Sequence, residues 1–392
     1  MKSYTLASTT WDNSEMEAIQ DVLQSGQLTM GEQVLAFEQE FADYVGSSFA
    51  VMVNSGSSAN LALIAACRYR NTPLFNPGDE VLVPAVSWST TYYPVNQQGG
   101  ILKFVDINPE TLNLDIKKVE ESINSKTKAI LVVNLLGNPA ELARLKEIAD
   151  DRKLLLIEDN CESLGATLEG RHAGTFATGG TYSTFFSHHM STMEGGMVVT
   201  NDEPLFHTLK SIRAHGWTRD LPEVNFVHNK TRNKWEDSFR FVLPGYNLRP
   251  LEIEAAIGRV QLQKLDGFIK TRRENAAYFL SQMSKLSDYR IQKETGESSW
   301  FGFSIVMEGK LKNLRTELVY ELQQAKIESR PIVAGNFTRN PVIKHLVHAA
   351  LGPLPVADEI HDRGFFVGNH HFKLEEEIDR LVTVLHEFQE RY

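Results

Sequence analysis

The residues with the widest chemical potential lie between Ser183 and Gly196, in the run Ser-Thr-Phe-Phe-Ser-His-His-Met-Ser-Thr-Met-Glu-Gly-Gly. The run combines hydroxyl groups, the imidazole pair His188-His189 and a Gly-Gly step into a following apolar stretch. Imidazole transfers protons near neutral pH, and hydroxyl groups bind phosphate oxygens. We therefore expect proton transfer beside a phosphate. No metal is expected, because adjacent histidines seldom both face one zinc ion and no third ligand stands at a recognised spacing.

A second candidate for phosphate binding is the segment Asn54-Ser55-Gly56-Ser57-Ser58-Ala59-Asn60, which follows an apolar run and precedes an apolar helix. A glycine and small hydroxyl residues at a helix start present free N–H groups and the positive end of the helix dipole, which together bind phosphate. The alternative is a serine-rich turn that only caps the helix. Gly56 and Ser57 are the candidate ligands.

Carboxylates follow the apolar run 154–157, namely Glu158, Asp159 and Glu162. Burying a carboxylate is costly unless it meets a cation or hydrogen-bond donors, so at least one should have a defined partner. A protonated pyridine nitrogen would serve for Asp159, and the alternative is a set of hydrogen bonds from the following loop. Trp88 follows another apolar run, where it could stack on a flat ring or pack in the core.

The elements that must position these residues alternate between short apolar runs and helical stretches through the first 200 residues. Most runs are continuously apolar, which predicts a parallel sheet covered by helices on both faces. Ligands of such sheets gather beyond the carboxyl ends of the strands, where the candidate residues stand. The predicted strands are 49–53, 80–83, 102–105, 129–133, 154–157, 181–185 and 197–200. A long helix over 251–283 and a strand over 300–306 follow a domain boundary near residue 245.

Composition limits the class of protein. The chain has 392 residues, a formal net charge of −10 and two cysteines. Without a long basic run, nucleic acid and anionic membranes are not expected partners. Two cysteines are too few for a disulfide framework or a cysteine-held iron–sulfur cluster. The polar first 17 residues and the absence of a long apolar run predict a cytoplasmic protein.

Several motifs stand in an order that resembles one family. They are Ser-Gly-Ser-Ser-Ala-Asn (55–60), Gly-Asp-Glu-Val-Leu-Val-Pro-Ala (78–85), Phe-Val-Asp-Ile (104–107), Ile-Glu-Asp-Asn (157–160), Ser-(x)4-His-(x)5-Glu-Gly-Gly (183–196), His-Gly-Trp-Thr-Arg (215–219) and Gly-Tyr-Asn-Leu-Arg-Pro (245–250). Over nearly the whole chain they resemble the sugar aminotransferases among the fold-type I pyridoxal-phosphate enzymes. The resemblance implies an aspartate aminotransferase-like α/β fold. It has a mixed, mostly parallel sheet in a large domain (1–245) and a smaller α+β domain (246–392).

The resemblance also implies roles for individual residues. The cofactor phosphate would be held by Gly56, Ser57 and Ser183, the pyridine nitrogen would pair with Asp159, and Trp88 would stack on the ring. Glu162 stands where the family usually has a glutamine beside the cofactor. Asn247 would reach the phosphate in the neighbouring subunit, which implies a homodimer with shared active sites. For the amino donor and the sugar, the candidates are His215, Arg219 and Arg330, since arginine matches carboxylates bidentately.

The sequence departs from the aminotransferases at His188, where they carry the cofactor lysine six residues before Glu-Gly-Gly. Imidazole cannot form the stable covalent link that a primary amine makes, but it remains a good base at neutral pH. With Gly296–Phe303, this departure resembles the 3-dehydratases of deoxysugar biosynthesis. The resemblance implies that pyridoxal 5'-phosphate and pyridoxamine 5'-phosphate are cofactors, L-glutamate is the amino donor and a GDP-linked 4-keto-6-deoxy sugar is the substrate. It places the chain in colitose and lipopolysaccharide O-antigen synthesis.

Three alternatives stay open at this stage. One is a nucleotide-sugar aminotransferase that has recruited another lysine, and one is a dehydratase for a differently linked sugar. The iron–sulfur-dependent type of the latter conflicts with the two distant cysteines. The third is a catalytically silent binding protein that has lost its lysine.

Overall fold

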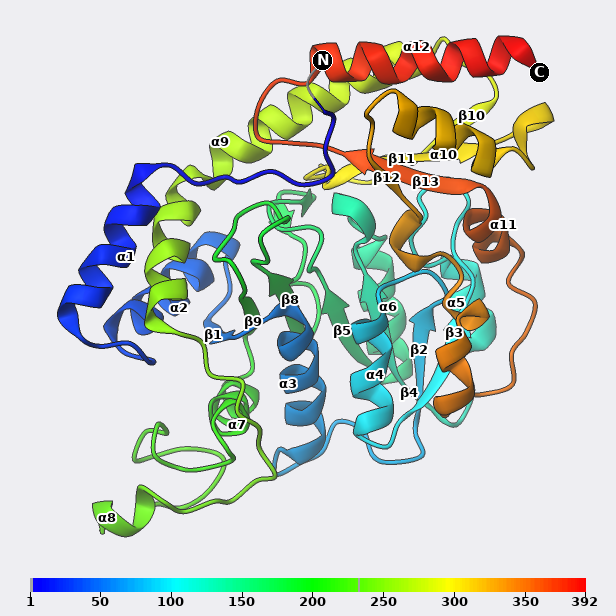
Figure 1. Ribbon diagram of the computed structural model, residues 1–392. Coiled ribbons are helices and arrows are strands. Elements are labelled where there is room, and N and C mark those ends of the chain that lie inside the picture. Colours follow the sequence, from blue (N-terminus) through cyan, green and yellow to red (C-terminus); the bar gives the residue numbers. More distant parts are fainter. Residues whose placement is uncertain (1–2, 232) are drawn as a thin grey trace.

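The computed structural model describes residues 3–231 and 233–392, and a seven-stranded sheet lies at its centre (Figure 1). Its order is β1-β9-β8-β5-β4-β2-β3. Strands β3, β2, β4, β5 and β8 are parallel to one another, whereas β9 runs antiparallel to both β8 and β1. The strands are β1 (Phe49–Val53), β2 (Glu80–Pro84), β3 (Ile101–Val105), β4 (Thr127–Val133), β5 (Leu155–Asp159), β8 (Gly179–Ser183) and β9 (Gly196–Thr200). This is the mixed, mostly parallel α/β sheet expected from the sequence.

Helices cover this sheet and explain its apolar strands. Strands β2, β5, β8 and β9 are buried along their whole length, because a parallel sheet is covered on both faces. The helices of this part are α1 (Asn13–Ser25), α2 (Glu32–Val45), α3 (Gly56–Tyr69), α4 (Ser89–Gln97), α5 (Ile116–Ser122), α6 (Leu142–Arg152), α7 (Glu203–Arg213) and α8 (Lys234–Asp237). A small hairpin, β6 (Thr167–Leu168) and β7 (Arg171–His172), follows β5.

A second, four-stranded antiparallel sheet of order β10-β11-β13-β12 lies above the first in Figure 1. Its elements are β10 (Tyr289–Ile291), β11 (Gly302–Met307), α10 (Arg315–Gln324), β12 (Ser329–Arg330), α11 (Pro355–Arg363), β13 (Gly364–Gly368) and α12 (Glu375–Arg391). The 32-residue helix α9 (Glu252–Met283) runs from α1 and α2 to α12. All strands of the large sheet precede residue 201 and all strands of the small sheet follow residue 288. The domain boundary at residue 245 stays a prediction.

Two strands differ from the sequence-based expectation in where they begin or end. The strand expected over 300–306 begins at Gly302, because Trp300 has a left-handed φ of 48° that an extended strand cannot contain. The strand expected over 181–185 ends at Ser183, which turns the following residues into the loop that carries His188.

Over the described ranges, none of the helices combines the length and apolar character required to cross a lipid bilayer. Within the same ranges, no three or more His, Cys, Asp or Glu side chains are grouped so that they could hold a metal ion.

A buried ion pair fixes β1, whose end leads into α3. The Arg213 side chain of α7 is 3% exposed and donates to the Glu38 carboxylate of α2 and to the Met52 carbonyl at 2.8 Å. Glu38 also accepts the Met52 N–H at 2.8 Å. The pair therefore joins two helices to the strand, and each charge depends on the other for its solvation.

Replacing Glu38 with Ala should destabilise the fold by about 3–5 kcal/mol, because Arg213 is left as a buried charge without its partner. Urea unfolding followed by circular dichroism measures the change. The matched control is Glu40→Ala on the same helix, whose ion pair with Arg259 is more than a third exposed and should cost about 0–1 kcal/mol. Equal losses in the two variants would contradict this account of the Glu38 pair.

Candidate active site

A cavity of about 440 Å³ lies where the carboxyl ends of the central strands meet the end of β12 (Ser329–Arg330). Sheets of this kind usually bind their ligands beyond the carboxyl ends of the strands. Residues predicted from the sequence that line it are Gly56, Ser57, Trp88, Asp159, Glu162, Ser183, His188 and Arg330. Among the described residues that line this cavity there is no lysine.

The floor of the cavity is formed by the N-terminus of α3. Ser55 caps the helix by accepting the Ser58 N–H at 3.1 Å, and Ser57 donates its hydroxyl to Thr90 at 3.0 Å. Gly56 touches the end of β8 so closely that a Cβ there would lie 2.6 Å from the Cβ of Ser183. The helix start, Ser57 and Ser183 thus form one compact set of N–H and hydroxyl donors, which suits a phosphate.

Asp159 ends β5 inside the cavity and is 5% exposed. One of its carboxylate oxygens accepts hydrogen bonds from the Asn60 amide and the Thr91 hydroxyl, both at 2.8 Å. The other oxygen accepts the Cys161 N–H at 3.2 Å. Asn60 accepts in turn from the Thr181 hydroxyl at 2.6 Å. The carboxylate therefore has a fixed orientation toward any ring bound above it.

Sequence reasoning missed Asn60 and Thr91, although both gave a signal. Asn60 is a buried polar residue in an otherwise apolar stretch of α3, one helical turn after Gly56. Thr91 stands one turn into α4, three residues after Trp88. A polar residue on the buried side of a helix requires a partner, and here both find the same carboxylate.

Glu162 is a second acidic group in the cavity. It accepts the Leu136 N–H at 3.0 Å, and Leu136 is held at a left-handed φ of 54°. Burial, and to a smaller extent the negative charge of Asp159, raise the pKa of Glu162 to about 7, although the Leu136 hydrogen bond opposes the shift. Near neutral pH the carboxyl group therefore exists in both its protonated and ionised forms.

His188 lies in the loop after β8, half-buried against the ring of Phe301 at a centroid distance of 5.1 Å. Burial and the nearby positive charge of Arg272 lower the pKa of His188 to about 4. The ring is therefore neutral at physiological pH, and its enclosed Nδ1 atom has no hydrogen-bond partner within the described part of the chain. A neutral imidazole that faces the cavity is available as a base.

The neighbouring His189 has a different position. It is 1% exposed, lies outside the cavity lining and bonds through Nε2 to the Ser299 carbonyl at 3.1 Å. Burial is the main cause that lowers its pKa well below the usual value. Of the two adjacent histidines, His188 is thus the one that faces the reacting space.

Two side chains form the walls above this floor. Trp88 caps α4 and is 57% exposed, which leaves its indole face open toward the cavity. Arg330 reaches the cavity from β12 of the small sheet, and its side chain is exposed. The aromatic face of Trp88 suits a flat ring, and the guanidinium group of Arg330 suits an anionic substrate group.

The other predicted residues lie outside the lining of this cavity. His215 packs against Trp217 at 5.1 Å, and the Arg219 guanidinium lies 3.9 Å from the same ring. Asn247 accepts a hydrogen bond from Arg249 at 2.9 Å. The predicted roles of these three residues are untested within one subunit.

These features define the class of protein. A helix N-terminus with adjacent hydroxyls, a fixed carboxylate and an open tryptophan face stand around one cavity, and they fit the phosphate, the pyridine nitrogen and the ring of pyridoxal phosphate. Carried on a seven-stranded, mostly parallel sheet with a small second sheet, they mark a fold-type I pyridoxal-phosphate enzyme.

Comparison with known proteins identifies the family. The chain belongs to the DegT/DnrJ/EryC1/StrS aminotransferase family, whose model matches residues 9–386. It is 51% identical over 387 residues to the GDP-4-keto-6-deoxy-D-mannose 3-dehydratase of Yersinia pseudotuberculosis, covering 98% of each chain. It superposes with a TM-score of 0.96 on the Escherichia coli GDP-4-keto-6-deoxy-D-mannose-3-dehydratase with bound hydrated PLP, at 51% identity and over 98% and 100% of the two chains. With a TM-score of 0.95 and 51% identity it matches the H188N mutant of GDP-4-keto-6-deoxymannose-3-dehydratase (ColD) with bound GDP-perosamine, over 97% and 100%.

Replacing Gly56 with Ala should weaken binding of pyridoxal phosphate about tenfold, because the added methyl group displaces the helix start from Ser183 and Cys161 and a displacement near 1 Å is costly. Absorbance titration of the apoenzyme measures the affinity. Gly267→Ala on α9 is the control, since a Cβ there meets no atom within 4 Å. Unchanged affinity in Gly56→Ala would remove the helix start from the binding site.

Proposed function

We propose that this chain is a pyridoxal-phosphate-dependent 3-dehydratase that removes the C3 hydroxyl of GDP-4-keto-6-deoxy-D-mannose to give GDP-4-keto-3,6-dideoxymannose. L-glutamate supplies the amino group, and 2-oxoglutarate and ammonia are released. The net reaction balances without an external reductant, because the two electrons that reduce C3 come from the oxidation of glutamate. The resemblance at 51% identity over nearly the full length supports this substrate.

The observation that carries the proposal is His188 in a cavity whose described lining residues include no lysine. An aminotransferase returns its product with the help of a lysine amine, and imidazole has no equivalent covalent chemistry. Proton transfer, however, needs only a base in reach of the reacting carbon. The site therefore retains the proton chemistry and lacks the amine chemistry of the transferases.

The residues around the cavity have distinct roles in this proposal. Gly56, Ser57 and Ser183 hold the cofactor phosphate, Trp88 stacks on the ring, and Asp159 keeps the pyridine nitrogen protonated. Bound pyridoxal phosphate supplies an electron-withdrawing ring that acidifies the C–H bond next to its attachment point. Glu162 lies beside the cofactor with its carboxyl group in both protonation states near neutral pH.

His188 removes the proton in this proposal. Because burial keeps its pKa near 4, the base form is present throughout the neutral range and needs no activation. A proton taken up by so weak a base is readily given back, so the same ring can deliver it to a departing hydroxyl. Arg330 binds the glutamate carboxylate or a sugar-linked anionic group from the opposite wall.

The decisive test incubates the holoenzyme with L-glutamate and GDP-4-keto-6-deoxy-D-mannose and measures ammonia and the sugar product by mass spectrometry. We expect stoichiometric ammonia and a 3-deoxy ketosugar, and His188→Asn should lower the rate about 10²- to 10⁴-fold, as loss of a general base does. His189→Asn is the matched control and should retain most activity. An aminosugar product would instead establish amine transfer, and a protein that fails to bind pyridoxal phosphate would be a silent relative.

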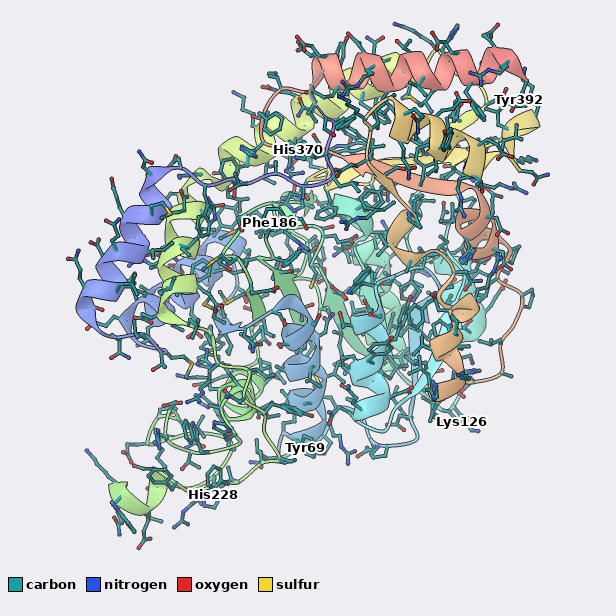
Figure 2. The ribbon with its side chains drawn as sticks, in the orientation of Figure 1. Tyr69, Lys126, Phe186, His228, His370 and Tyr392 are labelled. Carbon is teal, nitrogen blue, oxygen red and sulfur yellow. The ribbon has the colours of Figure 1, made fainter. Side chains whose placement is uncertain are left out.

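A homodimer with shared active sites is the second part of the proposal. The segments 215–231 and 233–245, here called the projecting segment, extend from the body and include α8 (Figure 1). Figure 2 shows His228 on it, far from Phe186 in the His188 loop. Its exposed aromatic side chains include Trp235, 80% exposed, and Phe239 and Phe241. Such a surface favours burial against a second copy.

The same dimer accounts for three predicted residues that lie outside the cavity of their own subunit, namely Asn247, His215 and Arg219. They stand at the base of the projecting segment and away from the cavity of their own subunit. We place Asn247 at the cofactor phosphate of the partner's site, with His215 and Arg219 near its substrate. A twofold axis makes this exchange reciprocal.

Mixed dimers test the shared site. Asn247→Ala and His188→Asn should each have low activity alone. When they are co-expressed, half of the dimers are mixed and carry one intact site of two, which predicts about a quarter of the wild-type activity. Heterodimers isolated through two different tags should show about half of the wild-type activity, because each has one intact site of two. Heterodimers as inactive as the parents would show that Asn247 acts within its own subunit.

A further inference from the structure

The motif Gly296–Phe303, prominent in the sequence, forms a turn whose position depends on the buried guanidinium of Arg272. Arg272 belongs to α9, is 3% exposed and donates through Nη1 to the carbonyls of Asn369, Phe301 and Trp300 at 2.7, 3.3 and 3.4 Å. Within the described chain, no carboxylate pairs with this guanidinium, and burial lowers the pKa of Arg272 to about 10. It therefore stays charged at neutral pH although its partners are neutral.

The turn that Arg272 holds is under strain and in close contact with the large domain. Trp300 has a φ of 48°, and the Phe301 N–H donates to the Leu136 carbonyl at 3.0 Å. A Cβ on Gly137 would lie 2.5 Å from the Trp300 nitrogen. A strained residue persists only where its surroundings fix it, and strain of this kind gathers at functional sites.

The result of this arrangement is the location of the Phe301 ring. Its centroid lies 5.1 Å from the ring of His188 and 5.7 Å from that of His189. His189 also bonds to the carbonyl of Ser299 in the same turn at 3.1 Å. The wall against which His188 packs is therefore fixed from behind by Arg272.

We propose that Arg272 is a positioning residue for His188: it holds the 299–301 turn so that Phe301 packs against the imidazole. The inference rests on the proposed role of His188 as the base. Arg272 does not line the cavity, so it acts through the turn and through its electrostatic field.

Other charged and titratable groups also surround His188. They come from its own loop, from the end of β5 and from β12, and they are His189, Glu194, Asp159, Glu162 and Arg330. After burial, the positive charge of Arg272 is the second cause of the lowered pKa of His188. Removing the guanidinium charge should therefore raise this pKa, so that protonation inactivates the base at a higher pH.

The test is the half-reaction of the holoenzyme with L-glutamate alone, followed by the loss of pyridoxal-phosphate absorbance between pH 4 and 8. For Arg272→Gln we expect the acid limb of the pH–rate profile, where protonation of His188 lowers the rate, to move up by about one pH unit. The rate at pH 7 should fall about tenfold through lost positioning. Arg272→Lys keeps the positive charge, so its acid limb should lie at the wild-type pH. Phe301→Leu should lower the rate and leave the pH of the acid limb unchanged.

The matched control is Arg273→Gln, the next residue of α9, which bonds to the Ser298, Gly165 and Glu297 carbonyls. It should leave the acid limb unchanged, because the charge of Arg273 is not a cause of the lowered pKa of His188. A folded Arg272→Gln with the wild-type profile, an equal shift in Arg273→Gln, or a Phe301→Leu variant with wild-type rates would overturn the inference.

A wild-type enzyme that does not react with glutamate would count against the proposed function and not against this inference. In that case, carbethoxylation of His188 by diethylpyrocarbonate, which requires the neutral ring, gives the same comparison. Its rate against pH, read by mass spectrometry of the peptide, should shift in Arg272→Gln and not in Arg273→Gln.

Discussion

The chemistry of this site depends on one imidazole that stays neutral because its surroundings disfavour a positive charge. Burial of His188 and the field of Arg272 act in the same direction and lower its pKa to about 4. In water the same ring would be partly protonated at neutral pH and partly unavailable as a base. Burial and the charge of Arg272 thus keep the imidazole in its proton-accepting form, where a lysine would first require its pKa to be lowered.

The sheet brings the remaining chemistry to this imidazole. Parallel strands end at one edge, so Asp159 at the end of β5 and Ser183 at the end of β8 meet the start of α3. The packing leaves little freedom, because Gly56 touches Ser183 with no space for a Cβ. Asp159 is held by three donors from three different segments. Orientation at this edge is thus decided before any ligand binds, which lowers the cost of ordering it.

The small sheet and α9 complete the site from the opposite side. Arg330 enters the cavity from β12, while Arg272 of α9 and the 299–301 turn support the wall behind His188. Elements far apart in sequence therefore control one ring. The ring of Phe301, just before β11 of the small sheet, lies 5.1 Å from that of His188, so the position of the base depends on both sheets.

The sequence by itself determined the large sheet and most of its strands, because continuous apolar runs are local patterns. Ordered motifs that resemble one family identified eight of the residues that line the cavity. The sequence also determined the departure at His188, which is a matter of residue type. Only the tertiary structure decided that His188 and not His189 faces the cavity, that Asn60 and Thr91 hold Asp159, and that Arg272 lies behind Phe301. These contacts join residues up to 99 positions apart. Side-chain direction and long-range packing are set by the whole fold, and no local pattern encodes them.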